Sequence, residues 1–442
     1  MVYEAIPVDQ KQINGFRSYV NIKFVFAKKP DYFLLILSAI FFLFLLTHQP
    51  AFDLDSISYI HGSIIRQPLD PLFIGLFKWA GKNQLLFVMW TQSVLTFFSF
   101  YYARNWIRRN LFISDFFIML AFICTFITVT FYYQIQHIDS EGLAFPLFIF
   151  AFFSLVECFK NANVYNIIKL NILISILILL RTQFYFFYPI LFILLCWYYI
   201  KKTPSKFLVF FAFAVIFFAS LTNIADRTYH YVKQGYFKTE PFSGVLLVVQ
   251  PLFLSKSIVL NDFKNANDRD FAKSLLSNMH EPSKNLYLNK WNHYQSDYTA
   301  YSKIYNTILT DELNESADLL AENIFSVNQQ ADHIAVVLFQ NNIKENLFFY
   351  GYKVINAFGR VSFFLFFLMM FFVSFISVFR NKFFASDQSG VFIFCSVLVM
   401  FFNALIICLA EPNLTVYYCY TQFLLYCLAA FLADRIFRRS AQ

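Results

Sequence analysis

Long runs of apolar residues dominate the chain and restrict the folds that it can adopt. A helix needs about 20 mostly apolar residues to cross the hydrocarbon layer of a bilayer. Ten runs approach this length: 32–48, 84–103, 112–133, 142–159, 165–180, 184–200, 207–223, 361–379, 390–410 and 415–434. They lack the strict alternation of barrel strands. The sequence therefore predicts an all-α polytopic membrane protein with about ten transmembrane helices.

The composition excludes several other classes of protein. Apolar residues make up 59% of the 442 residues and charged residues 14%, against about 45–50% and about 25% in soluble domains. These values exclude an ordinary soluble enzyme and a disordered chain. The net charge of +8 is spread over many short loops, so we expect the lipid bilayer as a partner and no nucleic acid.

The distribution of lysine and arginine predicts the orientation, because these residues concentrate in cytoplasmic loops. With the N-terminus inside, 18 of the 35 fall in cytoplasmic segments and 4 in short external loops, while the others lie between Arg227 and Arg360 in a long loop. Only three residues separate the runs 165–180 and 184–200. Merging them into one bent helix would move later basic clusters outside. The count favours ten spans, with both termini cytoplasmic, in the cell inner (plasma) membrane.

These spans divide the chain into four parts. Residues 1–30 form a cytoplasmic or interfacial segment, 31–223 hold about seven spans, 224–345 form an external and mostly helical soluble domain, and 346–442 hold about three spans. In the first external loop, residues 71–82 are apolar but too short to span, which predicts an interfacial helix. The run 244–249 is either strand-like or a shallow re-entrant piece.

Unusual polar residues gather on the external side of this topology. They are Asp53, Asp55, Tyr59 and His61 in the first external loop, His137, Asp139 and Glu141 in the second, Arg181 at the end of a span, and Glu411 in the last loop. Carboxylates near one membrane face can bind a divalent cation, bind a proton or act as a general base. Solvated loop residues are the simpler interpretation. Arg181 either extends to the interface or holds a phosphate.

Three motifs resemble those of the GT-C superfamily of integral membrane glycosyltransferases. The first external loop contains Asp55-Ser56-Ile57-Ser58-Tyr59 and is followed by a span that contains Gln92. The second loop ends in Asp139-Ser140-Glu141 at the start of a span, and Leu179-Leu180-Arg181 closes a later run. The likeness covers about the first half of the chain, and the second half offers a compatible layout.

The resemblance implies an enzyme that moves a sugar from a polyprenyl-phosphate donor to a lipid-linked or cell-surface glycan acceptor at the outer face, with inversion. It implies Asp55 as the general base, with Asp53 as the fallback, and Arg181 on the leaving phosphate. Asp139 and Glu141 would orient the acceptor or hold a divalent cation, Mg or Mn. The other expected substrate-binding residues are Tyr59, His61, His137, Arg227 and Glu411.

Three alternatives remain open. An O-antigen or exopolysaccharide polymerase or ligase would depend on Arg227 and Arg360 more than on Asp55. A transporter or flippase for lipid-linked glycans places polar groups at the middle of the membrane, often in a repeated design. Here the span centres are almost free of ionisable residues and no repeat is evident. A structural membrane scaffold would tolerate replacement of its carboxylates.

Overall fold

Helices account for almost all of the described chain. The computed structural model describes residues 31–52, 55–130, 136–241, 243–254, 262–279, 321–358, 361–380, 388–409 and 415–440. Over these ranges the β pairing is limited to one isolated bridge, between Ala51 and His137. The predicted all-α class is confirmed. The N-terminal segment 1–30 lies outside the described residues.

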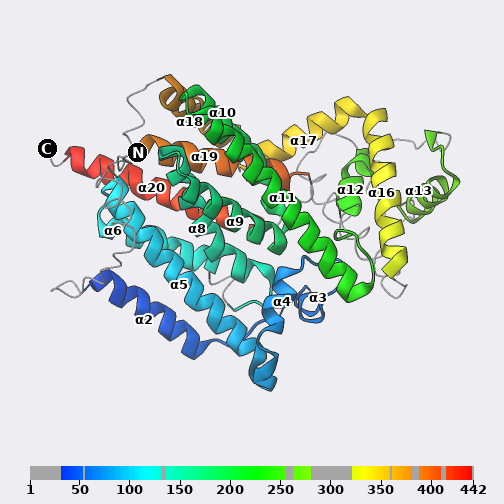
Figure 1. Cartoon of the computed structure of the whole chain (residues 1–442), viewed down its shortest axis with the longest axis horizontal. Helices are drawn as coiled ribbons and strands as arrows, with labels where there is room; N and C mark the ends of the chain where they lie inside the picture. The colour runs from blue at the N-terminus through cyan, green and yellow to red at the C-terminus, as the bar shows by residue number, and fades with distance from the viewer. Residues whose placement is uncertain are drawn as a thin grey trace, which may run out of the picture.

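The main bundle is built from ten helices, one in each of the predicted runs (Figure 1). They are α2 (Tyr32–Thr47), α5 (Gln84–Leu111), α6 (Asp115–Thr125), α8 (Ser140–Lys160), α9 (Val164–Leu180), α10 (Phe187–Ile200), α11 (Ser205–Gln234), α18 (Val361–Arg380), α19 (Gln388–Ile407) and α20 (Cys419–Ser440). Shorter elements connect them: α3 (Ser56–His61), α4 (Leu69–Gly75), η1 (Lys78–Asn83), η2 (Phe126–Thr130), η3 (Thr182–Phe186) and η7 (Thr415–Tyr418).

Five helical segments are long and apolar enough to cross a membrane. They are Lys78–Leu111, Ser140–Lys160, Thr182–Ile200, Ser205–Gln234 and Gln388–Ile407. The pair Ile343–Ala357 and Ser362–Ile376, bent by 87°, would make a sixth. Helices α2, α6 and α9 are apolar but shorter. These segments fit a membrane protein, and five or six of them in the described chain meet the length expected of a full crossing.

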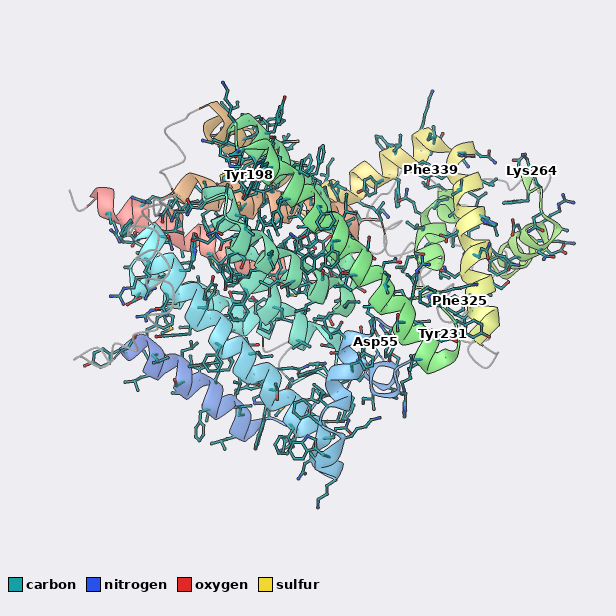
Figure 2. The ribbon with its side chains drawn as sticks, in the orientation of Figure 1. Asp55, Tyr198, Tyr231, Lys264, Phe325 and Phe339 are labelled. Atoms are coloured by element: carbon teal, nitrogen blue, oxygen red, sulfur yellow. The ribbon has the colours of Figure 1, made fainter. Side chains whose placement is uncertain are left out.

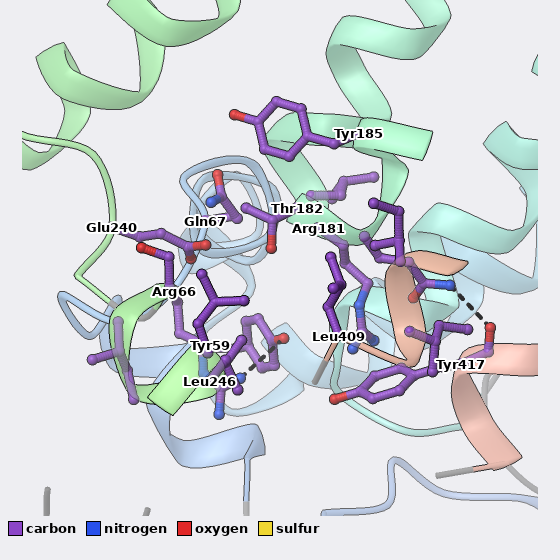
Figure 3. A pocket seen from close by; sticks show the side chains of 17 residues that line it. Tyr59, Arg66, Gln67, Arg181, Thr182, Tyr185, Glu240, Leu246, Leu409 and Tyr417 are labelled. Atoms are coloured by element: carbon purple, nitrogen blue, oxygen red, sulfur yellow. Dashed lines mark hydrogen bonds between the residues drawn. The ribbon is translucent and has the colours of Figure 1, made fainter. Parts of the chain in front are cut away.

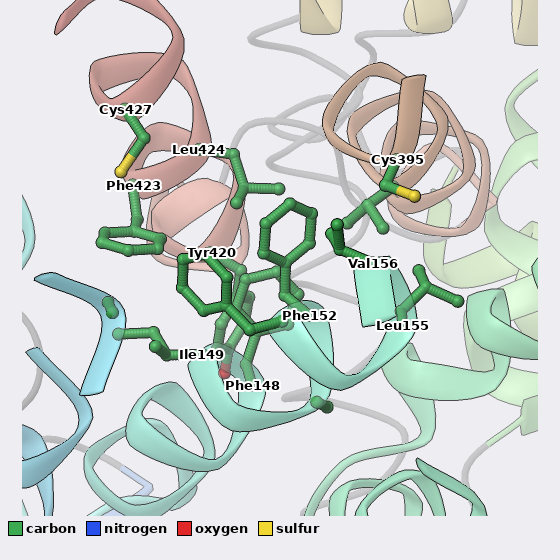
Figure 4. Packing of buried hydrophobic residues seen from close by; sticks show 14 of the residues in the cluster. Phe148, Ile149, Phe152, Leu155, Val156, Cys395, Tyr420, Phe423, Leu424 and Cys427 are labelled. Atoms are coloured by element: carbon green, nitrogen blue, oxygen red, sulfur yellow. The ribbon is translucent and has the colours of Figure 1, made fainter. Parts of the chain in front are cut away.

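Helix α8 forms the centre of the bundle. Nearly all of its side chains are buried, whereas α11 leaves most of its apolar surface exposed. Phe148 and Phe152 of α8 lie beside Tyr420 and Phe423 of α20 (Figure 4). The ring centroids of Phe148 and Tyr420 are 5.2 Å apart. A helix that is apolar on every side is stable here because other helices cover it all round.

Helices α9 and α10 run along α8 in opposite directions. Arg181, between them, pairs with Glu141 in the first turn of α8. At the other end, Tyr198 of α10 donates a hydrogen bond to the carbonyl of Cys158, in the last turn of α8, at 2.6 Å. Figure 2 shows Tyr198 and Asp55 toward opposite ends of the bundle. The two runs are therefore separate antiparallel helices and not one bent helix.

The helix ends that the sequence assigns to the cytoplasm lie together. The Arg104 guanidinium near the end of α5 bonds Asp31, before α2, at 2.6 Å and Asp115, at the start of α6, at 2.9 Å. The Asp434 carboxylate of α20 accepts from the backbone N–H of Ser114 at 3.1 Å. One end of the bundle is thus closed by ion pairs, and the candidate site lies at the other end.

A smaller lobe beside the bundle has its own apolar core (Figure 1). It comprises α12 (Ser243–Leu254), α13 (Ala266–Met279), α16 (Ala321–Asn341) and α17 (Ile343–Ala357). The run 244–249 is helical in α12 and not strand-like. Val245, Val248, Val249 and Leu252 are buried, and this i, i+3, i+4, i+7 spacing overrides the strand propensity of valine.

Helix α11 is longer than the apolar run 207–223 that it contains. Helix α11 continues without a break to Gln234, where Gly235, at φ 83°, ends it. Glycine adopts this left-handed conformation at no steric cost. The chain then returns toward the bundle, and this return places residue 240 in the site.

Candidate functional site

A cavity of about 320 Å³ lies between the first loop, η3, α12 and the end of α19 (Figure 3). Its polar lining comprises Tyr59, Arg66, Gln67, Arg181, Thr182, Gln183, Tyr185, Glu240, Ser243 and Tyr417. Leucines and isoleucines of α9, α12 and α19 supply much of the rest of the wall. The cavity thus combines charged groups with an apolar wall, which is the usual composition of a ligand site.

Arg181 enters the cavity from the point where α9 ends and the chain turns into η3. Its guanidinium pairs with the Glu141 carboxylate and lies 4.7 Å from the centroid of the Tyr417 ring. The Arg181 side chain is 14% exposed and that of Glu141 6%. Asp139 caps α8 by accepting from the backbone N–H of Gly142 at 3.3 Å. Both carboxylates lie at the positive end of the α8 dipole.

Arg66 is the second cation of the cavity and is held by α3. Its guanidinium bonds Asp55 at 2.5 Å and the Ser58 hydroxyl at 2.7 Å. It also lies 4.4 Å from the centroid of the Tyr59 ring. The Tyr59 hydroxyl is 3.0 Å from the hydroxyl of Ser140 on α8. These contacts fix the first loop on the start of α8.

A backbone bridge joins the same two loops. The N–H of Ala51 donates to the carbonyl of Gln136 at 2.7 Å, and the N–H of Ile138 donates to the carbonyl of Ala51 at 3.1 Å. The segments after α2 and before α8 therefore lie at one end of the bundle, as the sequence-based topology requires.

Asp70, in α4, is a buried carboxylate next to this site. It is 1% exposed, and neither of its oxygens has a hydrogen-bond partner within the described part of the chain. Burial raises the pKa of Asp70 to about 7, although the charges of Arg181 and Arg66 lower it. Asp70 therefore changes its charge near neutral pH.

Glu240 is the carboxylate that lines the cavity itself. Figure 3 shows it on the left of the view, near Gln67 and Thr182, with Tyr417 at the lower right. Both Gln67 and Thr182 favour the ionised form of its carboxyl group. Burial raises the pKa of Glu240 to about 7, and the negative charge of Asp226 raises it further.

Gln183 positions the far wall of the cavity. Its side-chain amide donates to the side-chain oxygen of Asn403 at 2.6 Å and to the carbonyl of Tyr417 at 2.9 Å. These two bonds tie η3 to α19 and to η7. Because three elements distant in sequence meet here, the position of the Tyr417 ring depends on the whole bundle.

The structure brings some of the sequence-predicted site residues together. Tyr59 and Arg181 line the cavity. Glu141 pairs with Arg181, and the charge of Asp139 acts on the same guanidinium. Asp55 contacts the cavity residue Arg66, but its own side chain is 61% exposed and does not line the cavity.

Other predicted site residues lie elsewhere. His61 is exposed at the end of α3. His137 takes part in the bridge between the two loops. Arg227, on α11, lies 6.0 Å from the ring centroid of Phe237 and does not line the cavity. Asp53 and Glu411 lie outside the described residues.

The described residues do not fit the predicted divalent-cation site. Among them, no group of three or more histidine, cysteine, aspartate or glutamate side chains is arranged to hold a metal ion. The Glu141 carboxylate, expected as a ligand, is neutralised by Arg181. We therefore derive no chemical step through a metal.

Sequence reasoning did not assign a role to Arg66, Gln67, Asp70 or Glu240. Asp70 carried a usable signal, because an acidic residue stands there within an otherwise apolar stretch. Glu240 carried none. It is an isolated carboxylate in a long polar loop, and only the return of the chain after α11 brings it to the cavity.

Comparisons with known proteins do not identify the chain. No family model, curated protein or solved structure matches it significantly. The resemblance to the GT-C superfamily therefore stays a prediction.

Proposed function

We propose that the chain is a membrane glycosyltransferase that uses a polyprenyl-phosphate sugar and transfers the sugar, with inversion, to a lipid-linked or cell-surface glycan. One observation carries the proposal: Arg66 and Arg181 line the same cavity, and part of its wall is apolar. A lipid-linked sugar phosphate has an anionic head and a long hydrocarbon tail. The cavity is complementary to both.

The two arginines suit the phosphate because a guanidinium forms paired, charge-assisted hydrogen bonds with phosphate oxygens. Each guanidinium has five N–H donors, so the pairing of Arg181 with Glu141 leaves donors for a ligand. When the bond between the sugar and the phosphate breaks, negative charge increases on the phosphate. Fixed positive groups at that place stabilise the transition state more than the bound donor.

The apolar wall suits the part of the lipid tail that adjoins the phosphate. Leu246 and Leu247 of α12 face the cavity together with Ile406 and Ile407 of α19. The part of the tail that enters this space packs against apolar side chains and is shielded from water. The head group would then be held at the end of the bundle while the rest of the tail continues into the bilayer.

We also propose that all ten apolar helices cross or enter the plasma membrane, with both termini cytoplasmic and the cavity external. The arrangement of the helix ends supports this topology. The basic end contains the start of α2 and the end of α20, whereas the cavity end contains the starts of α8 and α20 and the end of α9. The first-loop helices α3 and α4 would then lie at the outer interface.

The resemblance gives the role of general base to Asp55. In the structure, its carboxylate is bonded to Arg66. A donor phosphate is a competing anion for Arg66 and could release Asp55 to accept a proton. Asp55 as the base therefore remains a prediction that depends on this exchange of partners.

The rival functions have less support in the cavity. The polymerase or ligase alternative depends on Arg227, which does not line the cavity, and on Arg360, which lies outside the described residues. The flippase alternative places polar groups at the middle of the membrane, whereas the span centres here are almost free of ionisable residues.

The test compares surface and lipid-linked glycans of source cells with and without the protein. Complementation with the wild type tests whether the protein itself restores the glycan. Complementation with Arg66→Met, expressed at the same level, tests whether the cavity is required. Loss of a single sugar, restored by the wild type only, supports the transferase. Shortened glycan chains indicate a polymerase, lipid-linked glycan retained at the inner face indicates a flippase, and unchanged glycans contradict all three functions.

A further inference from the structure

The cavity contains a carboxylate that neither the motifs nor the resemblance assigns. Glu240 lines the same cavity as Arg66 and Arg181. It comes from the segment between α11 and α12, far in sequence from the two motifs in the external loops. An acid or base next to a bound sugar phosphate must lie within reach of the acceptor hydroxyl. Glu240 meets this requirement better than Asp55, which lies outside the cavity.

Two uncharged polar side chains lie near the Glu240 carboxyl group (Figure 3). They are Gln67 and Thr182, and both favour its ionised form. Neither partner carries a charge, so the carboxylate stays available to take up a proton. Asp55 and Glu141, in contrast, are each engaged in an ion pair with an arginine.

Helix α11 carries two buried residues that influence Glu240 electrostatically. Asp226 and His230 are both buried on this helix, with the Nε2 atom of His230 3.2 Å from the Asp226 carboxylate. Both act electrostatically on Glu240, and Asp226 disfavours its ionised form. The charged and titratable groups around Glu240 are thus Tyr59, Arg66, Arg181, Tyr185, Asp226, His230 and Tyr417.

We propose that Glu240 is the general base of the transfer reaction and that Asp55 serves to hold Arg66. This inference rests on the proposed function. The acceptor oxygen attacks the anomeric carbon while its proton moves to the Glu240 carboxylate. The new bond between oxygen and carbon forms as the bond between carbon and phosphate oxygen breaks. The electron pair stays on the phosphate, which leaves as polyprenyl phosphate, and Glu240 later releases its proton to water.

The test uses the full chain in lipid vesicles with a polyprenyl-phosphate sugar that carries a radiolabelled sugar. Water serves as the acceptor, and the released sugar is measured from pH 5 to pH 9. The base must be ionised to act, so the wild-type rate rises with pH, with its midpoint near the Glu240 pKa of about 7. Glu240→Gln loses this rise and falls by about 10²–10⁴-fold. Glu240→Asp keeps the rise at a lower rate.

Two further variants separate this role from a structural one. Asp226→Asn removes a negative charge near Glu240 and moves the midpoint to lower pH. Asp70→Asn is the matched control, because the pKa of Asp70 is also raised to about 7 but Asp70 does not line the cavity. The midpoint persists in that variant.

The outcomes distinguish the inference from the proposed function. If Glu240→Gln releases sugar with the same pH profile as the wild type, the inference is overturned and the transferase stands. If the wild type releases no sugar at any pH, the proposed function is overturned and the inference with it. If the rise disappears in Glu240→Gln and persists in Asp70→Asn, both are supported.

Discussion

Replacing Arg181 separates the stabilising role of this residue from its binding role. The Arg181 and Glu141 side chains are 14% and 6% exposed, so Arg181→Met leaves a buried carboxylate without its counter-charge. In the described part of the chain, the Glu141 carboxylate then keeps a hydrogen bond from the Ser140 hydroxyl, at 3.3 Å. Removing one partner of a buried ion pair costs about 3–5 kcal/mol. The variant therefore unfolds at a clearly lower temperature than the wild type.

The double variant Arg181→Met with Glu141→Gln removes both charges. Its cost falls to about 1–2 kcal/mol, since only a neutral group is left without a partner. Affinity for polyprenyl monophosphate behaves differently. Both variants lose about 1.5–3 kcal/mol of charge-assisted hydrogen bonding to the phosphate, which is about 10- to 150-fold in the dissociation constant.

Two measurements on the purified protein in detergent micelles check this reasoning. Thermal unfolding is followed by tryptophan fluorescence, and binding of polyprenyl monophosphate is measured on the same preparations. Recovery of stability without recovery of affinity in the double variant supports a phosphate-binding Arg181. Recovery of both would show that Arg181 acts only through Glu141, and an undiminished stability of the single variant would refute the buried pair.

Three further predictions concern other parts of the chain. Asp55→Asn removes the ion pair that holds Arg66, so we expect about a tenfold weaker affinity for the donor. The rate of sugar release should still rise with pH as in the wild type. Loss of this rise would identify Asp55 as the base. Asp70→Asn stabilises the protein by up to about 4 kcal/mol at pH 8 and by less at pH 5. The folded-state pKa of Asp70 is raised to about 7, so its ionisation above that pH costs stability; equal melting temperatures at pH 8 would contradict the burial. Gly244→Ala places a Cβ 2.1 Å from a backbone oxygen of α16, so it should destabilise the lobe by more than about 2 kcal/mol. Gly351→Ala is the control, because open space surrounds that position and no loss of stability is expected. Limited proteolysis of the lobe compares the two variants.

The sequence predicted the helices well because apolar runs without charges have few alternatives in a membrane. It also predicted that Arg181 and the start of α8 lie on one side, because each helix reverses the direction of the chain. That alternation needs only the order of the helices. The pairing of Arg181 with Glu141 is consistent with it.

The content of the cavity was less predictable. Glu240 reaches it because α11 extends past residue 223 to Gln234 and the chain then turns back. Arg66 reaches it because Asp55 and Tyr59 hold its guanidinium. The placement of Glu240 depends on how segments distant in sequence pack together, whereas that of Arg66 depends on contacts within the first loop. Periodicity and motif spacing do not contain this information.

We propose that the cavity recognises a lipid phosphate through its two arginines. The most direct test measures the affinity of the full chain in micelles for polyprenyl monophosphate and for the polyprenol of the same length. We predict that the phosphate form binds at least about tenfold more tightly, and that Arg66→Met with Arg181→Met and Glu141→Gln removes this preference. Equal affinities of the wild type for the two lipids would contradict the account.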